Sequence, residues 1–254
     1  MKDKKTGLIQ TLIGAIILVI GIVLCVNTYI VKGNKAYAFS LLVTILGIVI
    51  LIAGLYRTFS KKERKPVDAK VIAQAALCAA LCYVGATFIK IDIPVGTERT
   101  MFHFGNVFCV LAALLIGGEW GGLAGAIGMT ISDLSTAYVT SAPKTFILKL
   151  CIGLIVGFVA HKLFHLSKEH SAKYVAVATV VSSICGMAFN IVDPVVGYFY
   201  KTYLLGVPQD LAKTLAKIGA ITTSVNAVIA VIVASIIYLA LRPAMKKLNM
   251  LRDL

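Results

Sequence analysis

Long hydrophobic blocks recur along this chain, and they restrict its possible folds more than any other feature. The first runs from Gly7 to Val31 and the second from Ala36 to Tyr56, and further blocks follow as far as Leu241. A helix of about 20 apolar residues spans the roughly 30 Å hydrocarbon core of a bilayer. Charged residues make up only 14% of the chain, whereas a soluble domain has about 25%. The sequence therefore predicts an all-α integral membrane protein and excludes a soluble globular fold.

The blocks predict a two-helix transmembrane hairpin followed by a six-helix core. We expect the helical hairpin within residues 1–60, a basic cytoplasmic linker in residues 61–68 and the core in residues 69–254. The helices expected in the core are Ala69–Lys90, Phe102–Ile116, Trp120–Val139, Lys144–Leu163, Ala172–Tyr200 and Leu211–Leu241. Pro194 lies inside the fifth of these helices. Because proline removes a backbone hydrogen bond, we expect a kink or break there.

The distribution of Lys and Arg predicts the orientation of the chain in the membrane. With the N-terminus in the cytoplasm, the cytoplasmic segments hold 16 of these residues and the external segments hold 8. Cytoplasmic segments of membrane proteins carry an excess of positive charge. We therefore expect a multi-pass protein of the cell membrane with both termini in the cytoplasm. The net charge of +14 is then explained by loops that contact lipid headgroups, and nucleic-acid binding is not expected.

Polar residues within the core helices gather toward the ends that we place outside the cell. An ionisable residue in a membrane helix costs about 2.5–3.5 kcal/mol on insertion scales, so it usually faces a cavity or a partner. The inner halves of the same helices carry almost no charge. This pattern predicts one hydrated pocket that opens outward and is closed toward the cytoplasm. The candidate substrate-binding residues are His103, Asn106, Asp133, Tyr138, Lys149 and Asn190.

Five of the six candidates also have a purely structural interpretation. Asp133 and Lys149 could form an ion pair that stabilises the bundle. His103 and Asn106 could lie at headgroup level where a helix begins, and Asn190 could satisfy backbone groups freed by the nearby proline. The convergence of five helices on one depth nevertheless favours a shared pocket.

A stripe of small residues runs along the first core helix. Ala69, Ala73, Ala76 and Ala80 recur every three or four residues. Small residues allow helices to approach closely in lipid. From the spacing alone, the stripe fits packing within the chain and docking of a separate membrane partner equally well.

The sequence lacks the motifs of catalysis and of metal or cofactor binding. It contains no HExxH, no GxSxG on a strand-to-helix turn and no paired-aspartate metal motif. All six cysteines lie in apolar segments, where cysteine behaves as a small hydrophobic residue. Asp133 and Lys149 could transfer protons, but no further group completes an active site. We therefore expect a protein that is not an enzyme and that has no catalytic residues, no metal and no cofactor.

Several short segments occur together in one known family. In chain order they are Ile93–Thr97, His103–Phe108, Leu111–Gly117, Gly122–Gly128, Asp133-Leu134 and Ala142–Lys149. Through them, the stretch from Ile93 to Leu163 resembles the membrane-embedded S components of energy-coupling factor (ECF) transporters, in particular the riboflavin-transporter-like group. The N-terminal helical hairpin lies outside the usual six-helix core of that family, and the resemblance fades after Leu163.

The resemblance implies a substrate-capture subunit that binds a vitamin-like micronutrient from outside. A transmembrane T component and two ATPase subunits would then drive release inside, and this chain, which has no Walker A sequence, would not hydrolyse ATP. The family's binding residues correspond here to residues 92–101 and the six candidates above. The alanine stripe resembles the family's docking surface for the T component. A stand-alone secondary transporter or facilitator that uses the same pocket is the alternative function.

Aromatic residues near the outer rim would suit a flat heteroaromatic ring, with Asp133, Lys149 and Asn106 at its polar edge. Riboflavin, a pyridoxine-like compound and a pyrimidine precursor all fit that description. The aromatic residues are Phe102, Phe104, Tyr138, Tyr198 and Tyr203.

Overall fold

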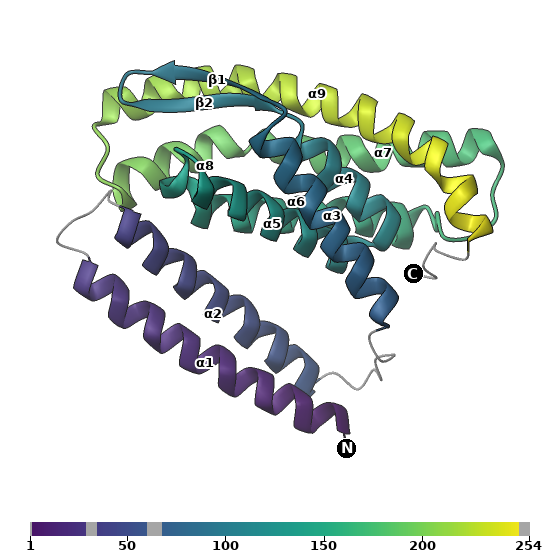
Figure 1. Cartoon of the computed structure of the whole chain (residues 1–254), viewed down its shortest axis with the longest axis horizontal. Coiled ribbons are helices and arrows are strands. Elements are labelled where there is room, and N and C mark those ends of the chain that lie inside the picture. Colours follow the sequence, from purple (N-terminus) through teal and green to yellow (C-terminus); the bar gives the residue numbers. More distant parts are fainter. Residues whose placement is uncertain (1, 29–34, 60–67, 249–254) are drawn as a thin grey trace.

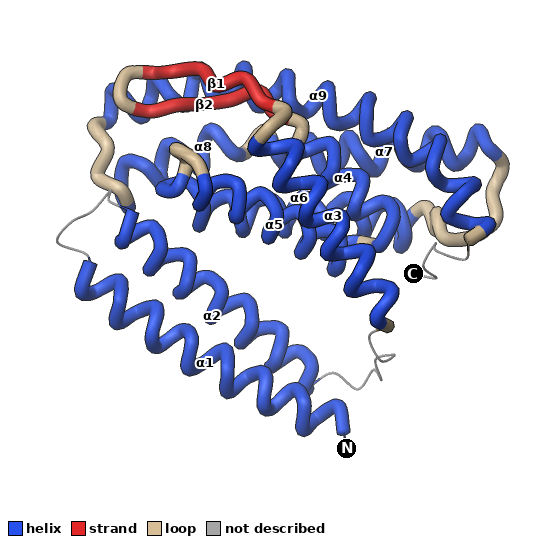
Figure 2. The backbone as a smooth tube through the Cα atoms, viewed as in Figure 1, coloured by secondary structure: helices blue, strands red, loops and turns tan. Residues whose placement is uncertain are grey.

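The structure is a computed structural model that describes residues 2–28, 35–59 and 68–248. Most of the predicted linker and of the turn between the first two helices lies outside these ranges. Helices dominate the described part of the chain, and one β-hairpin is added to them (Figures 1 and 2). The main elements are α1 (Lys2–Thr28), α2 (Lys35–Phe59), α3 (Ala69–Thr87), β1 (Lys90–Val95), β2 (Glu98–His103), α4 (Gly105–Ile116), α5 (Gly118–Ser135), α6 (Ala142–Gly157), α7 (Ala172–Asn190), α8 (Asp193–Phe199) and α9 (Gln209–Lys247). Three short helical turns complete them: η2 (Val139–Ser141), η3 (Phe158–Leu163) and η4 (Tyr200–Leu204).

Length and hydropathy make this a multi-pass membrane protein. Within the described ranges, six helical stretches are long and apolar enough to cross a bilayer, and α4 is a shorter apolar helix. The prediction of an all-α membrane protein with an N-terminal helix pair is thus confirmed. α1 begins and α9 ends toward one end of the molecule, while the β-hairpin lies at the other end (Figure 1).

α1 and α2 pack along a seam of glycines spaced seven residues apart. Gly7, Gly14 and Gly21 on α1 face α2, and Gly47 and Gly54 on α2 face α1. A β-carbon added at Gly14 would lie 2.4 Å from the backbone nitrogen of Leu51. The two backbones are therefore in direct contact, which is how small residues stabilise helix pairs in lipid. We call α1 and α2 together the helical hairpin.

Glycine contacts of the same kind join α5 to its neighbours. A β-carbon added at Gly157 would lie 2.1 Å from the backbone nitrogen of Gly118, and one added at Gly153 would lie 2.2 Å from Cα of Gly122. These contacts fix α6 against α5. The centre of the bundle is filled mainly by α4, from Val107 to Ile116, which is buried almost completely.

Residues 90–103 form a β-hairpin, where the sequence analysis placed the end of one helix, a loop and the start of the next. The prediction of helices over Ala69–Lys90 and Phe102–Ile116 was therefore wrong at these ends. β1 and β2 pair antiparallel with Val95 opposite Glu98, which leaves a two-residue turn. Gly96 occupies its first position with φ of +60°, a backbone conformation that a two-residue type II′ turn requires. β-branched residues in β1 favour a strand over a helical end.

The predicted break at Pro194 is confirmed. α7 ends at Asn190, and Pro194 lies in the first turn of α8, where a missing N–H costs nothing. The chain then passes through η4 and a turn at Gly206, whose φ is +71°, before α9 begins. This break directs α8 and η4 against the β-hairpin end of α9.

Candidate functional site

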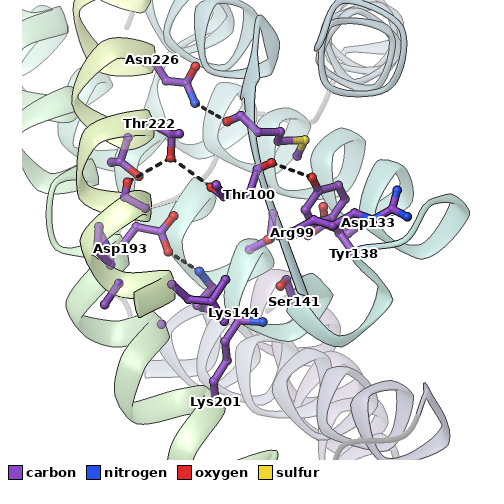
Figure 3. Close-up of a pocket in the computed structure, with 18 of the residues that line it drawn as sticks. Arg99, Thr100, Asp133, Tyr138, Ser141, Lys144, Asp193, Lys201, Thr222 and Asn226 are labelled. Carbon is purple, nitrogen blue, oxygen red and sulfur yellow. Dashed lines mark hydrogen bonds and ion pairs between the residues drawn. The ribbon is translucent and has the colours of Figure 1, made fainter. Parts of the chain in front are cut away.

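A cavity of about 130 Å³ lies beneath the β-hairpin, among α5, α6, α8 and α9 (Figure 3). We call it the pocket. Its apolar lining comes mainly from Met101, Met129, Pro194, Ala212, Leu215 and Ala216. Its polar lining consists of Arg99, Thr100, His103, Asp133, Tyr138, Ser141, Lys144, Thr145, Lys149, Asp193, Tyr198, Lys201, Thr222, Thr223 and Asn226.

Asp133 and Lys149 are the pocket's deeply buried charged residues from α5 and α6. Their relative exposures are 4% and 5%. The Thr145 hydroxyl donates to the Asp133 carboxylate at 2.5 Å, and the Lys149 ammonium donates to Oδ1 of Asn190 at 3.0 Å. Among the ion pairs of the described residues, none joins Asp133 to Lys149 directly. Each charge thus has a neutral partner, and both side chains line the pocket.

Two ion pairs connect elements across the pocket. Lys144 on α6 pairs with Asp193 on α8, and Lys201 on η4 pairs with Glu98 near the tip of the β-hairpin. Pairing lowers the cost of holding these partly buried charges away from water. The first pair is drawn in Figure 3, where Lys144 and Asp193 point toward each other. The pairs fasten α6 to α8 and the β-hairpin to η4.

The β-hairpin is held over the pocket by side chains of α9 and of the segment after α5. The side-chain amide of Asn226 donates to the carbonyl of Met101 at 3.0 Å and accepts from the backbone N–H of His103 at 3.0 Å. Four residues earlier on α9, the hydroxyls of Thr222 and Thr100 lie 3.0 Å apart. The hydrogen bond from Asn226 to Met101 and the contact of Thr222 with Thr100 are drawn in Figure 3, and together these contacts make β2 the roof of the pocket.

Tyr138 joins the two strands of this roof. Its hydroxyl donates to Oδ1 of Asp92 at 2.8 Å and lies 3.1 Å from the carbonyl of Thr100. Partial burial raises the pKa of the Asp92 carboxyl, but hydrogen bonds from Tyr138 and Lys90 and the nearby cations more than offset this, so the net pKa lies below its usual value. Burial and the adjacent Asp92 raise the pKa of the Tyr138 hydroxyl. Asp92 is therefore ionised and Tyr138 protonated at neutral pH.

Four of the six candidate binding residues line the pocket, namely His103, Asp133, Tyr138 and Lys149. Asn190 lies behind the wall and accepts the hydrogen bond from Lys149. Asn106 is buried in α4, with an exposure of 1%, and does not line the pocket.

Several lining residues were not among the candidates. Four of them are at the helix ends where the sequence predicted a cluster of polar residues, namely Lys144, Asp193, Thr222 and Asn226. Their position along the helices was therefore predicted, but they were not chosen as binding residues. Arg99, by contrast, lies within residues 92–101, the range that the family resemblance implied for binding, and it reaches the pocket from β2. The opposite charges of Lys144 and Asp193 were the signal available for these residues.

The alanine stripe of α3 faces outward. Ala69, Ala73, Ala76 and Ala80 are all exposed, whereas Val71, Gln74, Cys78 and Cys82 on the other face of α3 are buried. Packing against α4 and α5 therefore uses the other face of the helix. The stripe remains available to lipid or to a membrane partner.

Comparisons with known proteins indicate the family of this chain. A protein from Pyrococcus woesei, described as an uncharacterized protein in a gap 3′ region, is 32% identical over 75 residues, which cover 30% of this chain and 50% of that relative. The chain thus spans about half the length of that curated relative. No solved structure matches the chain significantly. The family model described as "ECF-type riboflavin transporter, S component" matches residues 67–243, well over half of the chain. This match covers all the residues that line the pocket, and the chain belongs to the family of ECF-type riboflavin transporter S components, the substrate-binding membrane subunits of these transporters.

Proposed function

We propose that this subunit captures a vitamin or related micronutrient from outside the cell and delivers it inward with ATP-driven partners. The observation that carries the proposal is the placement of the pocket. Charged and polar side chains surround a cavity at one end of the bundle, while Val107–Ile116 fill the centre with apolar packing. Such an arrangement suits binding from one side.

We propose that the ligand contacts His103, Asp133, Tyr138 and Lys149, and that Asn190 positions Lys149 from behind. Asn106 is buried in α4 and does not line the pocket, so we propose that it supports the site from behind. Asp133 offers acceptor oxygens and Lys149 offers donors, which together suit the polar edge of a heteroaromatic ring. Tyr138 and Tyr198 supply aromatic surface on the wall. Since the family description names riboflavin, that vitamin is the first compound to test.

A ligand as large as a flavin requires the pocket to widen. Its volume of about 130 Å³ is below the roughly 300–1,000 Å³ of typical small-molecule sites. The β-hairpin roof is attached by side-chain contacts at Glu98, Thr100 and the backbone around Met101. Displacing the roof would release these contacts and enlarge the pocket.

The partners we propose are a transmembrane T component and two ATPase subunits, in the cell membrane. The exposed alanine stripe of α3, at Ala69, Ala73, Ala76 and Ala80, is the proposed docking surface for the T component. A stripe of small residues on an outward face permits close contact with another membrane helix.

Identification of the bound molecule tests the substrate. The full-length subunit is purified in detergent, and mass spectrometry identifies any small molecule that accompanies it. Riboflavin is then titrated while its fluorescence is followed. We expect saturable quenching at one site per chain. A subunit that retains no vitamin-like molecule and leaves flavin fluorescence unchanged would contradict the proposal.

Dependence on partners separates an importer subunit from a stand-alone transporter. Uptake of radiolabelled riboflavin is measured in cells that express the chain with or without the T component and ATPases. We expect uptake only when all partners are present. Uptake by the chain alone would favour the stand-alone function.

A further inference from the structure

α2 attaches the helical hairpin to the core through two apolar patches near the pocket. In the first, which we call the η4 patch, Tyr37 is buried against Tyr200 and Leu205. In the second, which we call the α6 patch, Leu42 is buried against Ala126 and Phe146. Leu41 and Val207 border the η4 patch, and Ile45, Leu46, Val49 and Leu150 border the α6 patch.

The core side of each patch adjoins pocket residues in the chain. Phe146 follows Thr145, which donates to Asp133, and Leu150 follows Lys149. Tyr200 precedes Lys201, the residue that holds the tip of the β-hairpin. α2 therefore lies behind two different walls of the pocket, one from α6 and one from η4.

These two walls are also joined on their inner side. The ion pair of Lys144 with Asp193 connects α6 to α8, which continues directly into η4. The hydroxyl of Tyr200 donates to the carbonyl of Thr140, in η2 just before α6, at 2.8 Å. α2 spans the same junction from behind, so separating the walls would break contacts on both sides.

Toward its end, α2 is more exposed. Leu55 is exposed there, and Phe59 has an exposure of 79%. Figure 1 shows the helical hairpin meeting the core near its β-hairpin end and diverging from it toward the other end. Contact is thus concentrated where the pocket lies.

We propose that α2 is a strap that holds the α6 and η4 walls of the pocket together and thereby sets the affinity for ligand. The helical hairpin precedes the residues 67–243 that the family model matches, so this role is additional to the family core. α1 stiffens the strap, because the glycine seam holds it against α2 backbone to backbone. The effect on affinity rests on the proposed function, whereas the effect on wall separation does not.

A distance measurement tests the strap without any ligand. Spin labels are placed at the exposed positions Ile147 on α6 and Tyr203 on η4, in the full-length subunit with its native cysteines replaced. The double variant Tyr37→Ala with Leu42→Ala removes one side chain from each patch. We expect pulsed electron paramagnetic resonance to show a broader and longer distance distribution in this variant than in the parent. An unchanged distribution would overturn the proposal.

A matched control makes similar chemical changes on the exposed face near the end of α2. Leu55→Ala with Phe59→Ala removes one leucine and one aromatic side chain, both exposed, and should leave the distance distribution as in the parent. If both double variants broaden it equally, general loosening of the helical hairpin explains the result and the strap is refuted. Should the first variant not be recovered as a monodisperse protein, Leu42→Val is measured instead. It should broaden the distribution less, and no broadening would count against the strap.

Titration with riboflavin tests the effect on affinity. We expect Tyr37→Ala with Leu42→Ala to weaken binding about tenfold, equivalent to about 1.4 kcal/mol, while the control binds like the parent. Loss of wall contact without loss of affinity would overturn this half of the proposal. If the parent itself does not bind riboflavin, the flavin assignment fails, and the distance measurement still decides whether α2 acts as a strap.

Discussion

At the scale of single residues, the charged side chains of α5 and α6 that line the pocket each have a defined partner. Asp133 accepts a hydrogen bond from Thr145, and Lys149 donates one to Asn190. Lys144 forms an ion pair with Asp193. Asp133 and Lys149 could be selected from the sequence because a charge inside a membrane helix is energetically costly and usually faces a cavity or a partner. Lys144 and Asp193 stand 49 residues apart in the chain, and only the folded structure brings them together.

Replacing either buried charge of the pocket should weaken ligand binding. Asp133→Asn and Lys149→Met each remove the charge from a side chain that we expect to form a hydrogen bond with the ligand. Loss of such a charged hydrogen bond costs roughly 1.5–3 kcal/mol, or about ten- to a hundredfold in affinity. The measurement is titration of riboflavin against each purified variant. Lys246→Met, which breaks an exposed ion pair with Glu169 far from the pocket, is the matched control and should bind normally.

The double variant separates a ligand site from a structural charge pair. If Asp133 and Lys149 mainly stabilised each other, Asp133→Asn with Lys149→Met would restore both folding and binding. We expect the double variant to bind no better than either single variant. Binding at the parental level would return both residues to a structural role.

At the scale of elements, the β-hairpin was the main feature that the sequence did not predict. Phe88, Ile89 and Ile91 continue the apolar character of α3, so the segment reads as the end of a helix. Pro94 and Gly96 indicated a turn, but whether the residues around that turn form paired strands depends on contacts with α9. Asn226 supplies the hydrogen bonds that β2 would otherwise lack, and that contact joins residues more than 120 positions apart.

Removal of the Asn226 side chain should loosen the β-hairpin. Asn226→Ala leaves the carbonyl of Met101 and the N–H of His103 without this partner, at a cost of about 1–3 kcal/mol. Amide hydrogen exchange in residues 90–103 should therefore quicken by about tenfold or more. The control is Ser224→Ala, because the Ser224 hydroxyl bonds only to its own helix at Ala220. Equal exchange in the two variants would mean that Asn226 does not hold the roof.

The outward face of α3 leads to a prediction about assembly. Ala76→Leu or Ala80→Leu places a bulky side chain on the alanine stripe and should prevent close contact with a T-component helix. We expect reduced co-purification of the T component, with unchanged riboflavin affinity of the isolated subunit. Ala53→Leu, the same change on an exposed position of α2, should affect neither property. Normal assembly in both stripe variants would assign the stripe to lipid contact.

At the scale of the whole molecule, the all-α membrane architecture with its N-terminal helix pair was predictable because it follows from hydropathy. The contact between the helical hairpin and the core was not. Tyr37 and Leu42 belong to an apolar block in which nearly every residue is a possible contact. Lipid is as apolar as a protein neighbour, so the sequence carries little sign of which face of α2 is covered.

Orientation in the membrane can be tested with single cysteines in a variant whose native cysteines are replaced. A membrane-impermeant thiol reagent, applied to sealed cells, should label Thr97→Cys and Gly33→Cys from outside. It should label Leu248→Cys and Arg64→Cys only after lysis, because the excess of basic residues places those segments in the cytoplasm. Labelling of Leu248→Cys in sealed cells would reverse the orientation and turn the pocket toward the cytoplasm.

The glycine seam of the helical hairpin has a consequence for the order of events during synthesis. Every contact in the seam lies within residues 7–58, from Gly21 with Thr44 to Gly7 with Thr58. An N-terminal unit generally folds first as it leaves the ribosome. Both partners in the seam are translated before Phe146 and Tyr200 exist. The helical hairpin can therefore pair before α6 and η4 are synthesised, and these two elements would then pack against a helix pair that has already formed.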